Sequence, residues 1–184
     1  MGSGALGYSP GSSESQPYAK SYAACPDMLA EDKKDPEIYA PESGYFLNPS
    51  AFEVSAESAV EQRFYCENAK GRRVILNGKI PYVLDISGKL IAGIRNNPNN
   101  PSKRSPHPTL VGGLAPRVQC AGMLTFREGK IVSANLDSGH FRPARKSLAK
   151  VESYLAKLYE THPGLFDERS QWAKSNGASG GNER

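Results

Sequence analysis

The sequence lacks three features that would place the protein in a familiar class. No run of about 18 apolar residues occurs in its 184 positions, so we expect no membrane-spanning helix. The first ten residues, MGSGALGYSP, have neither a basic start nor an apolar stretch, which argues against a standard secretory signal and leaves signal-independent export open. No Walker-type loop is present to indicate ATP binding directly.

Cysteine and histidine are also scarce. Cys25, Cys66 and Cys120 stand at wide and unrelated spacings, with no CxxC pair and only three histidines to accompany them. This pattern is not a zinc signature, and an odd number of cysteines argues against a disulfide framework. We therefore expect no metal site and thiols that are buried or idle.

Charge and composition set broad limits on partners and domains. The net charge of +4 is modest, and most basic residues stand among acids, so nucleic-acid binding is not indicated. With 38% apolar residues the chain can form the hydrophobic core of a single domain. Residues 1–35 are rich in Gly, Ser, Pro and charge, which predicts a disordered arm, and 169–184 have the character of a flexible tail. Residues 36–168 should form a single α+β domain.

The elements expected in that domain are mostly strands. A short helix over about 56–69 would begin after Ser55 and end before Gly71. The runs RRVIL, IPYVLDI and KLIAGI, separated by NGK and SGK, predict an antiparallel meander. Residues 96–108 contain four prolines and cannot form a helix or a central strand.

A hairpin and a helix are expected after residue 116. Glu128-Gly129 is the turn signal, and in the second arm Val132, Ala134 and Leu136 alternate with polar residues, which predicts one buried face. An amphipathic helix should then pack on the small antiparallel sheet. Its apolar stripe is Leu148, Val151, Leu155 and Leu158, with Pro143 in the first turn and His162-Pro163-Gly164 as the stop. Its other face carries Arg145, Lys146, Lys150 and Lys157, which suits a solvated surface or a binding patch.

The stretch ANLDSGHFRPARKS, residues 134–147, joins the hairpin to this helix and contains the main candidate site. Such connections hold side chains rigidly while leaving them accessible. His140 could move a proton near neutral pH, and Arg142 with the helix start would suit a phosphate or carboxylate. Gly139 would permit a conformation or a close approach that a side chain blocks. The alternative is structural: Asp137 or Ser138 bonds the turn, and His140 fixes the loop.

A longer pattern around His140 carries a resemblance to known families. The segment HPTLVGGLAPRVQCAGMLTFREGKIVSANLDSGHFRP, with YVLDISGKLIAG upstream, resembles a C-terminal domain of bacterial polymorphic toxins that is also found in plant IQ-motif calmodulin-binding proteins. The resemblance covers about residues 80–160. It matches His107 to the histidine of HSSF, Thr109 to its second serine, Gly112 and Gly113 to a GG pair, Gly122 to the glycine of AAG, and Ser138 to Pro143 to SGHYRP.

The chain departs from that pattern in three places. Pro108 and Thr109 replace paired serines, Phe141 replaces a tyrosine, and an acidic residue often found shortly after SGHYRP is missing. A mechanism that needs this carboxylate would lack it here. No IQ-type segment is present, so calmodulin binding does not transfer.

The resemblance implies a secreted effector or toxin-like enzyme. It would leave its cell without a signal peptide, act in the cytosol of a target or host cell, and transfer a nucleotide-derived group to a target protein. AMP is the first choice and ADP-ribose the second, with ATP or NAD as co-substrate. A secretion chaperone or an immunity protein would be a further partner.

Each candidate residue then has an expected role. His140, Thr109 and Ser138 would be catalytic or would position the substrate. Arg142, His107, Gly112, Gly113 and Arg117 would bind substrate or phosphate. The alternative is a non-catalytic module that binds a protein through the basic helix face or the arm.

Overall fold

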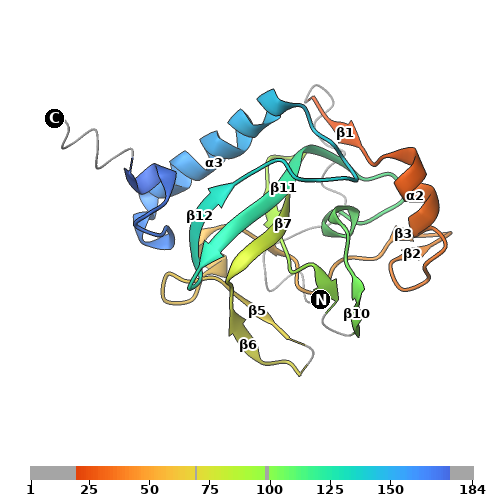
Figure 1. Ribbon diagram of the computed structural model, residues 1–184, viewed down its shortest axis with the longest axis horizontal. Helices are drawn as coiled ribbons and strands as arrows, with labels where there is room; N and C mark the ends of the chain where they lie inside the picture. Colours follow the sequence, from red (N-terminus) through yellow and green to blue (C-terminus); the bar gives the residue numbers. More distant parts are fainter. Residues whose placement is uncertain (1–19, 69, 98–99, 175–184) are drawn as a thin grey trace.

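The computed structural model describes residues 20–68, 70–97 and 100–174. Within these ranges a six-stranded antiparallel sheet forms the centre of the molecule (Figure 1), in the order β1-β11-β7-β8-β4, with β12 also paired to β11. Its strands are β1 (Tyr22–Ala23), β4 (Phe52–Glu53), β7 (Gly78–Asp85), β8 (Leu90–Ala92), β11 (Arg117–Arg127) and β12 (Lys130–Ala134). The α+β class with an antiparallel sheet is confirmed.

Two turns in the sheet follow from local side-chain chemistry. Between β7 and β8, one carboxylate oxygen of Asp85 accepts hydrogen bonds from the backbone N–H groups of Ser87 and Lys89. Between β11 and β12, Glu128 and Gly129 both have positive φ angles, 49° and 77°, as a type I′ hairpin turn requires. The expected hairpin is therefore present.

The second arm of that hairpin differs from the expected alternation. Thr125 pairs with Ser133 but Phe126 pairs with Ile131, so Val132 is an extra residue in a β-bulge. The bulge exchanges the two faces of the strand at this point. Ile131 is consequently fully buried, whereas Val132, expected in the buried face, is only half-buried.

Three smaller antiparallel pairs lie beside the main sheet. They are β2 (Tyr39–Ala40) with β3 (Gly44–Tyr45), β5 (Tyr65–Glu67) with β6 (Arg73–Ile75), and β9 (Asn96–Asn97) with β10 (Asn100–Arg104). The predicted meander is correct for β7 and β8 only, because β6 pairs with β5 instead of β7. Over its described residues the proline-rich segment 96–108 contains no α-helix and no strand of the main sheet, as expected, although its last two residues begin a 3₁₀ turn.

The helix predicted over 56–69 is wrong for its described residues. A single 3₁₀ turn, η2 (Ala56–Ser58), is followed by Glu61 and Gln62 at positive φ. Phe64 is then fully buried and contacts Phe52 and Phe126. Burial of this ring in the core outweighs the weak helical propensity of a segment with few apolar residues.

The C-terminal helix is confirmed. After the 3₁₀ turn η4 (Arg145–Ser147), α3 (Leu148–Thr161) buries Val151 and Leu155 against one face of the sheet, in one core cluster with Tyr82 and Leu124. The helix ends at His162, followed by the 3₁₀ turn η5 (Pro163–Leu165). Pro143 precedes these elements and is not in the first turn.

The opposite face of the sheet has its own core. Along β7, Tyr82 and Leu84 belong to the cluster beneath α3, whereas Val83 packs in a second cluster with Ile91 and Ala121. This strand alternation leaves the second face without α3 above it. Near the start of β7, that face carries a cavity instead of a packed layer.

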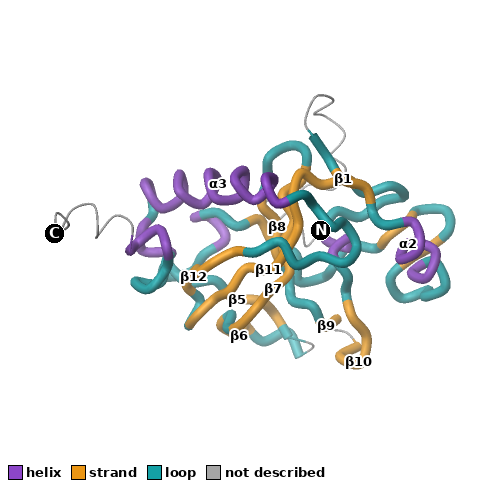
Figure 2. The backbone as a smooth tube through the Cα atoms, turned by 45° about the horizontal axis from the view of Figure 1, so that its top comes forward, coloured by secondary structure: helices purple, strands orange, loops and turns teal. Residues whose placement is uncertain are grey.

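The predicted boundaries of the domain need correction at both ends. Residues 22–32, assigned to the disordered arm, form β1, which pairs with β11, and α2 (Pro26–Asp32), which lies away from α3 (Figure 2). At the other end, Ser170 and Trp172 are buried although 169–184 were expected to be a tail. Residues 1–19 and 175–184 lie outside the described residues. No helix in the described part is both long and apolar enough to span a membrane.

Candidate functional site

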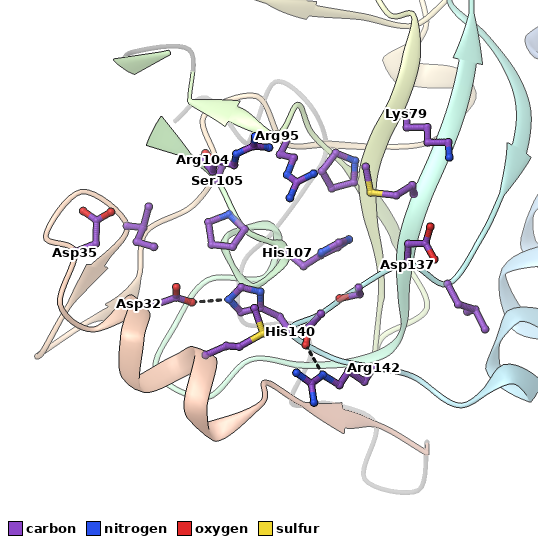
Figure 3. Close-up of a pocket in the computed structure, with 18 residues that line it drawn as sticks. Asp32, Asp35, Lys79, Arg95, Arg104, Ser105, His107, Asp137, His140 and Arg142 are labelled. Atoms are coloured by element: carbon purple, nitrogen blue, oxygen red, sulfur yellow. Dashed lines mark hydrogen bonds and ion pairs between the residues drawn. The ribbon is translucent and has the colours of Figure 1, made fainter. Parts of the chain in front are cut away.

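A large cavity lies between the second face of the sheet, α2 and the loop that contains His140 (Figure 3). Its volume is about 1070 Å³, just above the range of about 300–1,000 Å³ that is common for small-molecule sites. Its polar and charged lining residues are Asp32, Asp35, Lys79, Arg95, Arg104, Ser105, His107, Asp137, Ser138, His140 and Arg142. Met28, Ile38, Pro81, Pro106, Met123 and Leu136 supply apolar wall.

The imidazole of His140 is held by a carboxylate in this cavity. Nε2 of His140 lies 2.7 Å from Oδ2 of Asp32, and the two side chains are only 11% and 14% exposed. The hydroxyl of Tyr45 donates to the same oxygen at 2.8 Å. Burial, and then the bond to Asp32, raise the pKa of Tyr45, so this hydroxyl remains a donor. The carboxylate thus fixes the ring and places a proton on Nε2, which leaves Nδ1 as the acceptor in the neutral ring.

A tight turn fixes the backbone that carries His140. The N–H of Arg142 donates to the carbonyl of Ser138, and the N–H of Phe141 donates to the Ser138 hydroxyl. The buried ring of Phe141 anchors the turn in the second core. The carbonyl of His140 accepts the N–H of Cys25 at 2.6 Å, which ties the loop to the start of α2.

Two details of this turn differ from expectation. The residue with an unusual backbone is Arg142, at φ 42°, rather than Gly139. A Cβ on Gly139 would meet only the side chain of Met28, at 3.5 Å. Because α3 begins at Leu148, its N-terminus does not reach the turn, and no helix dipole assists an anion there.

His107 is the second histidine of the cavity and has a fixed tautomer. Its Nε2 lies 2.8 Å from the carbonyl oxygen of Gly122, which can only accept, so Nε2 carries a hydrogen. Burial, followed by the charges of His140 and Arg95, lowers the pKa of His107 to about 4 against an ordinary 6.5. The ring is therefore neutral at physiological pH, and its Nδ1 accepts no hydrogen bond from any described residue.

Four predicted site residues lie outside the cavity lining. Thr109 is buried, and its hydroxyl donates to the carbonyl of Pro106 at 2.6 Å, within the 3₁₀ turn η3 (His107–Leu110). Gly112 and Gly113 have positive φ angles, and Gly113 exchanges backbone hydrogen bonds with Tyr45. Arg117 donates to the hydroxyl and carbonyl of Ser21. These four residues form hydrogen bonds that hold the fold together, and none of them lines the cavity.

The structure brings together His107, Ser138, His140 and Arg142 from the predicted set, and adds residues that the sequence did not reveal. Asp32 was assigned to a disordered arm, although Pro26 at a first-turn position was a helix signal within it. Arg95, Arg104 and Lys79 had no recognisable motif, because they come from the bend before β9, from β10 and from β7.

The charges in the cavity are unevenly paired. Each acid has a partner: Asp32 bonds His140, Asp35 lies 3.5 Å from Lys103, and Asp137 accepts from Asn135. The side chains of Arg95, Arg104 and Lys79 form no hydrogen bond or ion pair with any described residue. The cavity therefore presents an excess of unneutralised positive charge.

The thiols show no sign of a site. Cys120 is buried, and Cys25 and Cys66 are half-buried, with burial raising the pKa of the Cys66 thiol. Within residues 20–68, 70–97 and 100–174, no group of three His, Cys, Asp or Glu side chains could hold a metal ion.

Comparison with known proteins adds no relative. No protein-family model matches the chain, and neither the curated proteins nor the solved structures contain a match.

Proposed function

We propose that the protein is a secreted effector or toxin-like enzyme that transfers a nucleotide-derived group to a target-cell protein, with AMP as the first choice and ADP-ribose as the second. The observation that carries the proposal is the Asp32–His140 pair, 2.7 Å apart, at the wall of a nucleotide-sized cavity with excess positive charge. The resemblance of residues 80–160 to a toxin domain supports the same class of function.

In the proposed reaction, His140 acts as the general base. With Nε2–H committed to Asp32, Nδ1 accepts the proton of a target hydroxyl group. The hydroxyl oxygen then attacks the α-phosphorus of ATP, forms the new P–O bond, and releases pyrophosphate. Asp32 stabilises the imidazolium that results, as a carboxylate does in a hydrolase triad. Cationic side chains around the cavity offset the phosphate charge.

Ser138 has a different role from the one expected. Its hydroxyl oxygen accepts the N–H of Phe141 and its carbonyl accepts the N–H of Arg142, so its bonds are used to shape the turn. We assign it to positioning of His140 in this proposal.

The test is mass spectrometry of target-cell proteins after expression of wild type and His140→Ala. Wild type should add the mass of AMP, or of ADP-ribose, to at least one protein, and His140→Ala should add neither at equal abundance. Thermal unfolding of the variant serves as the folding control. Equal modification by both proteins, or none by wild type, would contradict the proposal.

A further inference from the structure

The three cations without described partners are arranged as one group along one side of the cavity. Figure 3 shows Arg95 and Arg104 close together, with Lys79 farther along the same side, while His140 and Arg142 lie on the opposite side and His107 lies between. The group therefore faces the acid–base pair across the cavity.

Backbone pairing explains why the two arginines converge. Asn96 of β9 is the register partner of Arg104 in β10, and the N–H of Ser105 donates to the carbonyl of Arg95 at 2.6 Å. Arg95 lies in the bend directly before β9, so its backbone is close to that of Arg104, and both side chains line the cavity. Lys79 comes from β7, two residues before Pro81 on the same face of the strand.

Electrostatics leaves this group available for a ligand. Three like charges facing one cavity repel each other unless an anion binds among them. The acids that also line the cavity are engaged elsewhere, with His140, Lys103 and Asn135. The neutral ring of His107 adds no further positive charge to the group.

We propose that Arg95, Arg104 and Lys79 form a subsite for the diphosphate or triphosphate group of the nucleotide. Each guanidinium group can donate hydrogen bonds to two phosphate oxygens at once. Three cations from three segments therefore fit a chain of two or three phosphates better than a single phosphate. This assignment rests on the proposed function for its nucleotide. The subsite places the phosphates across the cavity from Asp32, and Arg142, predicted from the sequence to bind phosphate, is not part of it.

Calorimetric titration with inorganic phosphate, pyrophosphate and tripolyphosphate at constant ionic strength tests the subsite. Pyrophosphate should bind at least about tenfold tighter than phosphate, and Arg95→Gln and Arg104→Gln should each weaken it by about tenfold or more. Arg117→Gln is the matched control, because Arg117 bonds Ser21 outside the cavity, and its affinity should stay within about twofold. Because both arginines are exposed, the unfolding curves of Arg95→Gln and Arg104→Gln should match that of wild type, which serves as the folding control.

Three results would overturn the subsite: no saturable binding of any probe, an equal loss in Arg117→Gln, or a loss in Arg142→Gln with none in Arg95→Gln. The same titration separates this inference from the transfer reaction. His140→Ala should keep its pyrophosphate affinity. Pyrophosphate binding without any transferase activity would contradict only the proposed function. Transferase activity that does not change in Arg95→Gln and Arg104→Gln would contradict only the subsite.

Discussion

Asp32 and His140 are joined by a 2.7 Å contact across 108 positions of the chain. The contact connects α2 to the loop before α3, and the hydrogen bond from Cys25 to the His140 carbonyl holds the same two segments together. The N-terminal segment is therefore part of the candidate site and completes it.

Asp32→Asn should impair the proposed transfer more than it impairs folding. The amide keeps the size of the side chain but removes the charge that stabilises an imidazolium, so we expect a loss of about 100-fold or more in transfer rate. The readout is the initial rate of AMP incorporation into target proteins. Asp35→Asn is the control, since Asp35 also lines the cavity but pairs with Lys103. Equal rates for Asp32→Asn and wild type would show that the pair is structural.

Sequence patterns predicted the elements whose signals are local. The Glu128-Gly129 turn and the Leu148, Val151, Leu155 and Leu158 stripe each depend on neighbours within a few residues, and the hairpin and α3 were found. The β5–β6 pair is also local, but it was missed because β5 lies in the segment that was predicted to be a helix over 56–69. The bulge at Val132 was missed because the alternation of apolar and polar residues does not mark it. A single extra residue in the bulge is enough to reverse the predicted buried face.

Only part of the candidate site could be predicted from the sequence, because its residues come from segments far apart in the chain. His140 and His107 stand in motifs that a reader can recognise, whereas Asp32, Arg95 and Arg104 acquire a role only when three distant segments meet. Conversely, Thr109 and Arg117 have side chains suited to a site, but hydrogen bonds outside the cavity occupy them, to Pro106 three residues before Thr109 and to Ser21 directly before β1. Residue type suggests a capacity, and the fold determines whether it is exposed to a ligand.

The buried imidazole of His107 should make stability depend on pH. Its pKa is about 4 in the folded protein and 6.5 ordinarily, so between these values the unfolded chain gains a proton that the folded chain does not. This group's contribution is therefore fully present above pH 6.5 and is lost as pH falls toward 4, by about 3 kcal/mol in total.

His107→Gln isolates that contribution, because glutamine can still donate to the Gly122 carbonyl but does not titrate. Urea unfolding of both proteins at several pH values measures it. Wild type should lose more stability than the variant between pH 6.5 and 4. Parallel curves over this range would mean that the folded protein protonates His107 as readily as the unfolded chain.

Gly122→Ala should be strongly destabilising. A Cβ at this position would lie 1.9 Å from the carbonyl oxygen of Asn135, which is backbone and already accepts the hydroxyl of Tyr82. β11 and the residues that follow β12 would have to move apart, so we expect a loss of about 3 kcal/mol or more in the free energy of unfolding. Gly139→Ala is the comparison, since its Cβ meets only Met28 at ordinary contact distance, and its change should stay within about 1 kcal/mol. Similar losses in the two variants would refute the close approach.

Thr109→Val distinguishes a catalytic hydroxyl from a structural one. The hydroxyl is buried and donates to the Pro106 carbonyl, so its removal should cost about 1–2 kcal/mol of stability. The transfer rate per folded molecule should not change, because the side chain does not line the cavity. Thr109→Ser keeps the hydroxyl and should retain most of the hydrogen-bond contribution. Thermal unfolding and AMP incorporation, measured well below the transition, give the two readouts. If the Thr109→Val protein were as stable as wild type but inactive, the Thr109 hydroxyl would take part in the reaction.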